Sequence, residues 1–298
     1  MTNDKQNIAS RQLRLVTYLS IAANVFLIGG KFVVGFITGS LSLIADAIHS
    51  VSDMLTDIAV LLGLYFGSKK PDSSHPYGHG KLETLAAAAI ALGLLVVGLG
   101  MIYYAALDIA KDHVTRPQNL VLAAAIGAIA VKETVYRITK AVAMKYHSSA
   151  ALANAWHDRA DALSSVAVIV GVVAQKFGFN HGDQVAAIAV GVMVMIVAAK
   201  LIGDCLGELI ERAVDYATIE EIKKIIRANG QIRQYHRLRT RTLGREVFLD
   251  VHILVDPALS IAAAHEIASS LENALHNQLT RPVNITVHVE PDIPALRR

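Results

Sequence analysis

Residues 82–107 read LETLAAAAIALGLLVVGLGMIYYAAL, and this stretch decides the class of fold. Glu83, at its second position, is the only charged side chain in it. A helix must contain about 20 mostly apolar residues to cross roughly 30 Å of hydrocarbon. The stretch is long enough and apolar enough to do so, and it therefore predicts a transmembrane helix.

Five further apolar runs surround this stretch, and the connections between them are short. They cover residues 16–37, 41–66, 120–143, 150–174 and 185–207. The polar residues 1–15 lead directly into the first full-length run, which is unlike the short apolar segment of a cleavable signal peptide. From Arg212 onward charges are frequent, and no run is long enough to span a membrane. We therefore predict a six-span transmembrane domain at residues 1–211 and a soluble domain at residues 212–298.

The composition of the chain agrees with a membrane protein. Of its 298 residues, 53% are hydrophobic and 18% are charged, and the mean hydropathy is +0.43. Soluble domains carry about 25% charged residues, so most soluble enzymes and disordered chains are excluded. The single cysteine, Cys205, excludes a disulfide framework and a multi-cysteine zinc site. The net charge of only +3 is evidence against a nucleic acid partner, and the lack of a Walker-type loop is evidence against ATP as the driving force.

The distribution of Lys and Arg predicts the orientation in the membrane. An even number of spans puts both termini on one side, and the loops of that side are the richer in Lys and Arg. They carry Arg11, Arg14, Lys69, Lys70, Lys81, Lys140 and Lys145, whereas the opposite loops carry Lys111, Arg116 and Lys176. Because basic loops stay on the cytoplasmic side, both termini and the soluble domain are expected in the cytoplasm.

The soluble domain shows the pattern of a small α/β fold. Helices are predicted at residues 218–228 and 260–279, and strands at residues 237–243, 246–255 and 283–289. Thr218 is predicted as the N-cap of the first helix, with Glu221 completing a capping box. The first two strands are joined at Gly244-Arg245, which fits a hairpin turn. This order of elements favours a ferredoxin-like fold.

Two pairs of histidine and aspartate lie inside predicted spans. Residues 45–53 read ADAIHSVSD and residues 157–161 read HDRAD, so His49 and Asp53, like His157 and Asp161, are four residues apart. On a helix this spacing puts both side chains on one face. Two such faces turned toward each other would offer two nitrogens and two oxygens, a set that suits Zn²⁺ or a similar divalent ion.

A purely structural role for each pair is the alternative. An aspartate at the bilayer centre costs about 2.5–3.5 kcal/mol on insertion scales, so such residues are usually kept for function. Asp46, one turn before His49, either supports the ligands or simply lies near the aqueous side. Asp158 and Arg159 point away from the predicted ligand face and are assigned no site.

Two further clusters of possible metal ligands lie outside the spans. Turn-forming residues of the loop 69–81 hold the first cluster, which consists of Asp72, His75 and His79. The second lies in the soluble domain and consists of His236, His252, His265, His288 and Glu290. His288 and Glu290 are two apart on a strand and therefore face the same side. The alternative for the first cluster is an ordinary polar loop, and the alternative for the second is a set of exposed sheet histidines that bind no metal.

These features together resemble the cation diffusion facilitator family, and the layout is similar to that of bacterial zinc and ferrous-iron efflux transporters. The resemblance rests on six spans, the paired motifs in spans two and five, the HPYGHGK loop at residues 75–81 and the ferredoxin-like tail. It implies a homodimer in a bacterial inner membrane that exchanges divalent metal ions for protons. It also implies a transport site (His49, Asp53, His157, Asp161), a loop site (Asp72, His75, His79), a tail site (His236, His252, His265, His288, Glu290) and a charge interlock between subunits (Lys81, Glu211).

The chain departs from the bacterial iron and zinc pattern at two positions. His49 stands where that branch has aspartate, and the extra imidazole favours Zn²⁺, Cd²⁺ or Co²⁺ over Mn²⁺ and makes Fe²⁺ less favoured. Glu290 stands where aspartate is usual, and its longer side chain could still ligate.

The resulting hypothesis is a proton-coupled antiporter that exports divalent cations, most of all Zn²⁺, by alternating access, with no organic cofactor. Metal ions and protons compete for the same imidazoles and carboxylates, so each can displace the other near neutral pH. Two alternatives remain open: an intramembrane metal-dependent hydrolase, and a metal sensor or scaffold that does not transport.

Overall fold

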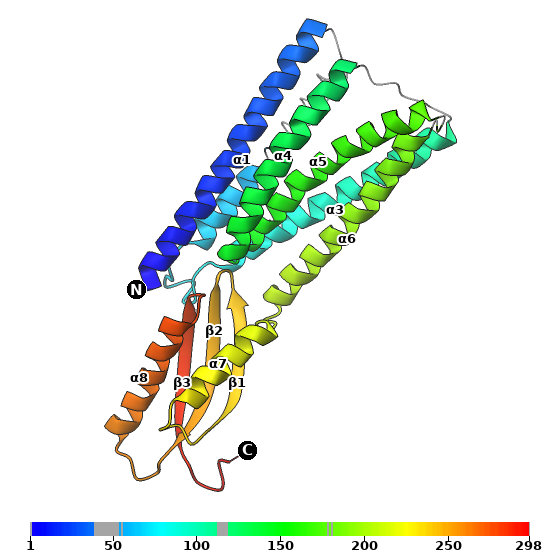
Figure 1. Ribbon diagram of the computed structural model, residues 1–298. Coiled ribbons are helices and arrows are strands. Elements are labelled where there is room, and N and C mark those ends of the chain that lie inside the picture. Colours follow the sequence, from blue (N-terminus) through cyan, green and yellow to red (C-terminus); the bar gives the residue numbers. More distant parts are fainter. Residues whose placement is uncertain are drawn as a thin grey trace. The chain divides into compact units, whose positions relative to one another are not determined.

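The computed structural model describes residues 2–38, 54, 56–111, 119–177, 179 and 181–297 (Figure 1). The chain divides into two compact units. The membrane unit consists of residues Ser10–Leu206, and the tail unit consists of Gly207–Arg298 together with Met1–Ala9.

The membrane unit is helical, as the apolar runs predict. It contains the helices α1 (Thr2–Thr38), α3 (Lys81–Ala110), α4 (Asn119–Lys145), α5 (Ser149–Lys176) and α6 (Gly182–Leu209), and a shorter helix, Thr56–Gly67. Segments of α1, α3 and α6, namely Ile8–Val33, Lys81–Ala110 and Gln184–Leu209, are long and apolar enough to cross a membrane. The predicted span 41–66 is described only in its C-terminal part, within the Thr56–Gly67 helix.

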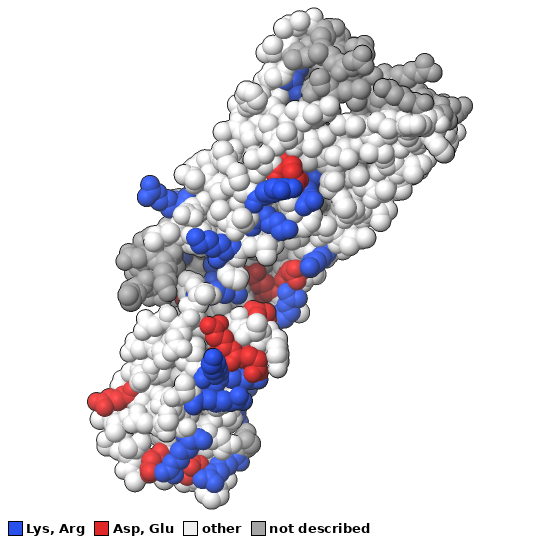
Figure 2. Space-filling view, viewed as in Figure 1, with Lys and Arg blue, Asp and Glu red and all other residues white. Residues whose placement is uncertain are grey.

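Large apolar side chains cover the outside of these helices. Phe26 and Phe36 of α1 are 73% and 80% exposed, and Val96 of α3 and Ile196 of α6 are 62% and 66% exposed. Charged side chains are sparse over the membrane unit in the view of Figure 2. A surface of this kind is stable against lipid and would aggregate in water, which supports the predicted membrane domain.

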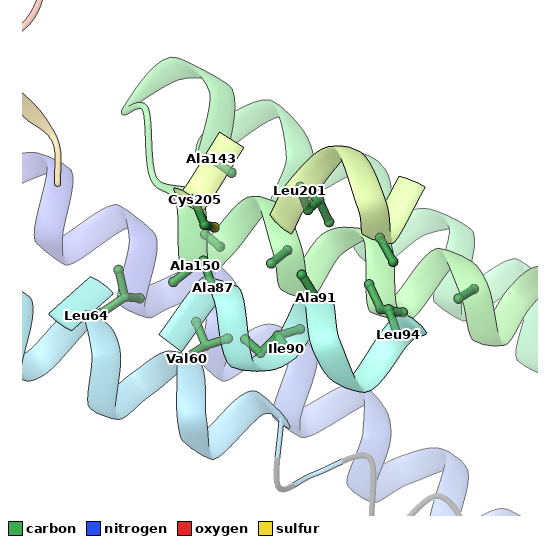
Figure 3. Packing of buried hydrophobic residues seen from close by; sticks show 14 of the residues in the cluster. Val60, Leu64, Ala87, Ile90, Ala91, Leu94, Ala143, Ala150, Leu201 and Cys205 are labelled. Atoms are coloured by element: carbon green, nitrogen blue, oxygen red, sulfur yellow. The ribbon is translucent and has the colours of Figure 1, made fainter. Parts of the chain in front are cut away.

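The core of the membrane unit is made of small and medium-sized side chains. Ala150 of α5 packs in one cluster with Ala87 and Ala91 of α3, Leu64 and Leu201, as Figure 3 shows. Small residues let helix backbones approach closely, and such contacts drive helix association in lipid. This packing positions α5, whose polar residues are described in the next subsection.

The tail unit forms a three-stranded mixed sheet with two helices. Its elements are α7 (Tyr216–Ala228), β1 (Gln234–Leu243), β2 (Glu246–Val255), α8 (Ile261–Gln278) and β3 (Val283–Pro291). The strand order is β1-β2-β3, with β1 antiparallel and β3 parallel to the central strand β2. Alternate residues of β2, such as Val247, Leu249 and Val251, pack with Ile222 of α7 and Leu271 of α8 in the core. The five elements predicted from the sequence are confirmed in type and order.

The first strand differs from its predicted bounds. It begins at Gln234 rather than at residue 237, and its pairing with β2 is irregular between His236 and Arg239. Arg237 has a φ of 52°, in the left-handed region that few non-glycine residues adopt. An irregularity of this kind interrupts the alternation of apolar and polar residues. The sequence pattern therefore predicted a strand that begins too late. It also leaves His236 paired with His252.

The predicted N-cap of α7 is wrong by three residues. Asp215, not Thr218, is the cap, and its carboxylate accepts from Thr218 N at 3.0 Å and from Thr218 Oγ1 at 2.7 Å. Thr218 therefore lies in the first turn as a donor to the true cap. Both residues are good N-caps, and Asp215 is favoured because it starts the helix almost one turn earlier.

Replacing Asp215 with alanine should destabilise α7 by about 0.5–2 kcal/mol, because its first amides lose their acceptor. The hydrogen bonds from the Thr218 hydroxyl and amide lower the pKa of Asp215. The cap is therefore fully effective above the unfolded pKa of about 3.9 and is lost as the pH falls through the lower folded value. Hydrogen exchange of the α7 amides at pH 7 would measure the effect. Glu221→Ala is the matched control, and a larger effect of that change would support the capping box instead.

Candidate functional site

The pair on α5 has the geometry that the sequence predicts. His157 Nε2 and Asp161 Oδ2 lie 4.0 Å apart, one helical turn from each other. His157 is buried and Asp161 is half-buried. His49 and Asp53, and Asp46 beside them, lie outside the described residues, so the predicted pairing of spans two and five stays a prediction.

A lysine inside the membrane unit joins this pair, and sequence reasoning missed it. Lys132 of α4 donates to Asp158 Oδ1 at 2.8 Å and to Asp161 Oδ2 at 2.9 Å. Lys132 is 7% exposed and Asp158 is 1% exposed. The sequence feature that could have revealed it is the position of this lysine in the middle of the predicted span 120–143, where a charge is costly unless it is paired.

The buried polar contacts continue from Asp158 to a second carboxylate, Asp57. The Ser20 hydroxyl lies 3.1 Å from Asp158 Oδ2 and 3.0 Å from Asp57 Oδ1, and donates to one of them at a time. Asn24 and Asn154 donate amide hydrogens to Asp57 at 2.7 and 2.8 Å. Four helices, α1, Thr56–Gly67, α4 and α5, therefore meet at one buried polar network.

Arg159 lies outside this network. Its guanidinium stacks over the rings of Tyr136, at 4.4 Å, and Trp156, at 5.7 Å. A cation held over aromatic faces is stabilised without a carboxylate partner. Arg159 is thus assigned no role in the site.

The loop cluster is brought together by a turn. His75 Nδ1 and His79 Nε2 lie 3.4 and 3.6 Å from the two oxygens of Asp72, and the donor atoms of the three residues all lie within 4.8 Å of one another. Backbone amides of His75 and Ser74 donate to Asp72 and lower its pKa. Gly78, with a φ of 86°, makes the turn that returns His79 to Asp72.

The tail cluster is formed across the sheet. His236, His252 and His288 pair side by side on β1, β2 and β3. Glu290 Oε2 lies 2.9 Å from His236 Nε2, and Glu290 Oε1 lies 2.8 Å from His252 Nδ1 and 3.4 Å from His288 Nε2. The hydrogen bond from His252, followed by that from His236, lowers the pKa of Glu290.

This donor set suits a transition-metal ion. The donor atoms of His236, His252 and Glu290 lie within 4.8 Å of one another. Nδ1 of His236 is buried and has no hydrogen-bond partner among the described residues. His265 is exposed on α8 and does not belong to this group of three.

The predicted charge interlock between subunits involves residues at element boundaries. Lys81 is the first residue of α3. Glu211 follows α6 with a φ of 64°, and its carboxylate accepts from Arg241 Nη1 at 2.8 Å. The interlock itself stays a prediction.

Comparison with known proteins identifies the family. Residues 17–210 match the family model of the cation efflux transmembrane domain, and residues 214–292 match that of the cation efflux protein cytoplasmic domain. The Manganese efflux system protein MneP of Bacillus subtilis is 30% identical over 298 residues, which cover 98% of this chain and 99% of MneP. Metal tolerance protein C1 of Arabidopsis thaliana is 33% identical over 288 residues, covering 92% of this chain and 61% of that longer protein.

Among solved structures, one described as "Mode of Action of a Putative Zinc Transporter CzrB" is 28% identical and covers 27% of this chain and 99% of its own, with a TM-score of 0.26. The family models together cover most of the chain, and MneP matches nearly from end to end. Members of this family are metal transporters and not enzymes. The chain belongs to the cation diffusion facilitator family of divalent metal cation efflux transporters, with a helical transmembrane domain and a cytoplasmic domain built on a small mixed sheet.

Proposed function

We propose that this protein is a proton-coupled antiporter that exports divalent metal ions, Zn²⁺ most of all, from the cytoplasm by alternating access. The transported ion binds His49, Asp53, His157 and Asp161. The observation that carries the proposal is the pair of buried His157 and half-buried Asp161 on α5, whose facing atoms lie 4.0 Å apart. Zinc binds imidazole nitrogen and carboxylate oxygen at about 2.0–2.2 Å, so a small side-chain rotation lets one ion contact both atoms.

Proton coupling follows from the same ligands. A metal ion requires neutral imidazole and ionised carboxylate, and protons compete for both. Histidine titrates near pH 6.5 in its reference state, which allows the exchange close to neutral pH. Protons that enter from outside can then displace an ion released there.

The experiment that tests the proposal is metal uptake into proteoliposomes under an imposed pH gradient, with Zn²⁺, Fe²⁺, Cd²⁺, Co²⁺ and Mn²⁺ compared. Uptake should be fastest for Zn²⁺ and should stop when an ionophore collapses the gradient. Uptake of none of these ions would overturn the transport function. Uptake that does not depend on the pH gradient would overturn proton coupling but not metal transport.

Metal selectivity is expected to depend on His49. Imidazole is a softer ligand than carboxylate, so His49→Asp should shift the preference from Zn²⁺ toward Mn²⁺. The ratio of initial Zn²⁺ and Mn²⁺ uptake rates measures this shift, with His181→Asp, outside the predicted sites, as control. An unchanged ratio would show that His49 does not set selectivity, and MneP, named for manganese, would then be the better guide to the ion.

We also propose that the protein is a homodimer in the inner membrane of a bacterium, with both termini in the cytoplasm, and that metal binding in the tail brings the two cytoplasmic domains together. In this proposal, His265, His288 and the Lys81–Glu211 interlock lie at or near this contact. The loop cluster of Asp72, His75 and His79 is a second binding site beside the membrane.

Zn²⁺ should stabilise the tail unit through its cluster. At about 100 times the dissociation constant, a ligand that binds only the folded state adds about 2.7 kcal/mol to the unfolding free energy. His236→Ala with His252→Ala should remove this zinc-induced gain, whereas His276→Ala, an exposed histidine of α8, should retain it. Thermal unfolding with and without Zn²⁺ measures the gain, and a full gain in the double variant would contradict the site.

A further inference from the structure

Lys132 and the proposed ion compete for one oxygen atom. Of the two oxygens of Asp161, Oδ2 is the one that lies 4.0 Å from His157 Nε2. The same Oδ2 accepts from Lys132 Nζ at 2.9 Å. A divalent cation shared by His157 and this oxygen would lie within a few ångströms of the ammonium group, and the repulsion between the two positive charges favours displacement of the ammonium.

Lys132 can leave Asp161 without becoming an unpaired charge. Its ammonium also lies 2.8 Å from Asp158 Oδ1, and Asp158 is buried. A buried charge that loses all its partners is strongly destabilising, whereas one that keeps a close partner is not. Asp158 thus offers the ammonium a resting position when Asp161 turns to a metal ion.

We propose that Lys132 is a resident cation of the transport site, which binds Asp161 when the site is empty and is held by Asp158 alone when a divalent ion is bound. This inference rests on the proposed function of Asp161 as an ion ligand. The ammonium compensates the carboxylate charge inside the membrane between transport cycles. It also lowers the affinity for the ion and so promotes its release.

Removal of this internal competitor should tighten ion binding. Lys132→Met with Asp158→Asn removes one positive and one negative charge together, so Asp158 is not left as a buried carboxylate without its cation. The amide oxygen introduced by Asp158→Asn can still accept from Ser20. Because Lys132 and the bound ion would be like charges within a few ångströms of each other, loss of the ammonium removes a repulsion, and a tenfold change in affinity corresponds to about 1.4 kcal/mol. We expect the Zn²⁺ dissociation constant to fall about tenfold or more, with a lower KM and a lower maximal rate of transport.

The test uses the full-length protein and Zn²⁺ as probe. The loop and tail clusters also offer ligands to Zn²⁺. Binding at the transport site is therefore measured, in the wild type and in each variant, as the Zn²⁺ binding that is lost when Asp161→Asn is added. Lys132→Gln, whose side-chain amide can still donate to Asp158, is a second test variant in case the double variant does not fold. Lys132→Arg retains the charge, and Arg137→Met on the exposed face of α4 is the matched control.

Tighter binding in Lys132→Met/Asp158→Asn or Lys132→Gln, with wild-type affinity in Lys132→Arg and Arg137→Met, supports the inference. Unchanged or weaker binding in the charge-removing variants overturns it. Equal tightening in Lys132→Arg also overturns it, because packing rather than charge would then be the cause. If Asp161→Asn removes no binding in the wild type, the proposed transport site itself fails.

Discussion

Replacing Asp161 with asparagine is expected to reduce Zn²⁺ transport by about 100-fold or more. Asparagine has the same shape, and its side-chain oxygen can still accept from Lys132, so the fold should survive. It carries no charge, however, and is a poor zinc ligand. Removal of a group that only orients a metal ligand lowers metal affinity about 10–100-fold, and removal of the ligand itself should lower it at least as much.

The measurement is initial Zn²⁺ uptake into proteoliposomes, with protein amount and fold checked by gel filtration. Glu133→Gln is a suitable control, because Glu133 pairs with Arg137 at 2.8 Å on α4 and is not one of the proposed ion ligands. Near-normal uptake by Asp161→Asn would contradict its role as a ligand. Loss of uptake in both variants would point to a general effect of removing carboxylates.

Replacing Asp57 with alanine should destabilise the membrane unit more than any of the preceding changes. Asp57 is 1% exposed and accepts from Ser20, Asn24 and Asn154. Its removal leaves buried donors without an acceptor, at about 1–3 kcal/mol for each group. We expect a loss of about 3 kcal/mol or more, which corresponds to a fall of order 10 °C in Tm.

Thermal unfolding of the detergent-solubilised protein measures this loss. Asp57→Asn should be milder, because one oxygen remains to accept. Glu133→Ala removes a carboxylate from a one-turn ion pair with Arg137, whose side chain is exposed, and should lower Tm far less than Asp57→Ala. Equal Tm values for the Asp57 and Glu133 variants would show that water or other groups satisfy the donors.

The membrane helices and the tail elements could be predicted because each depends on a local pattern. A helix in lipid satisfies its own backbone hydrogen bonds, so an apolar run such as residues 82–107 indicates a span without knowledge of its neighbours. Alternation along residues 246–255 likewise identifies β2, whose observed bounds are the same. The spacing of His157 and Asp161 predicts their shared face for the same reason.

The partners of buried charges depend on how helices face one another. Lys132 and Asp158 are 26 residues apart in the sequence, and Asn154 and Asp57 are 97 apart. Sequence reasoning overlooked Lys132, and hydropathy alone cannot tell which charged residues of different spans pair with one another. Similarly, the residue pattern shows only an interrupted alternation at the start of β1 and does not reveal the left-handed backbone at Arg237.

The sequence by itself determined the class of protein, its helical membrane domain, its α/β tail and the residue types available to bind metal, because hydropathy and periodicity are local properties. Only the tertiary structure decided that Lys132 lies between Asp158 and Asp161 and that His236, His252 and Glu290 converge on one face of the sheet. The physical reason is that electrostatic and ligand contacts act over a few ångströms in space between residues far apart in the chain, and only helix packing and strand register bring them that close.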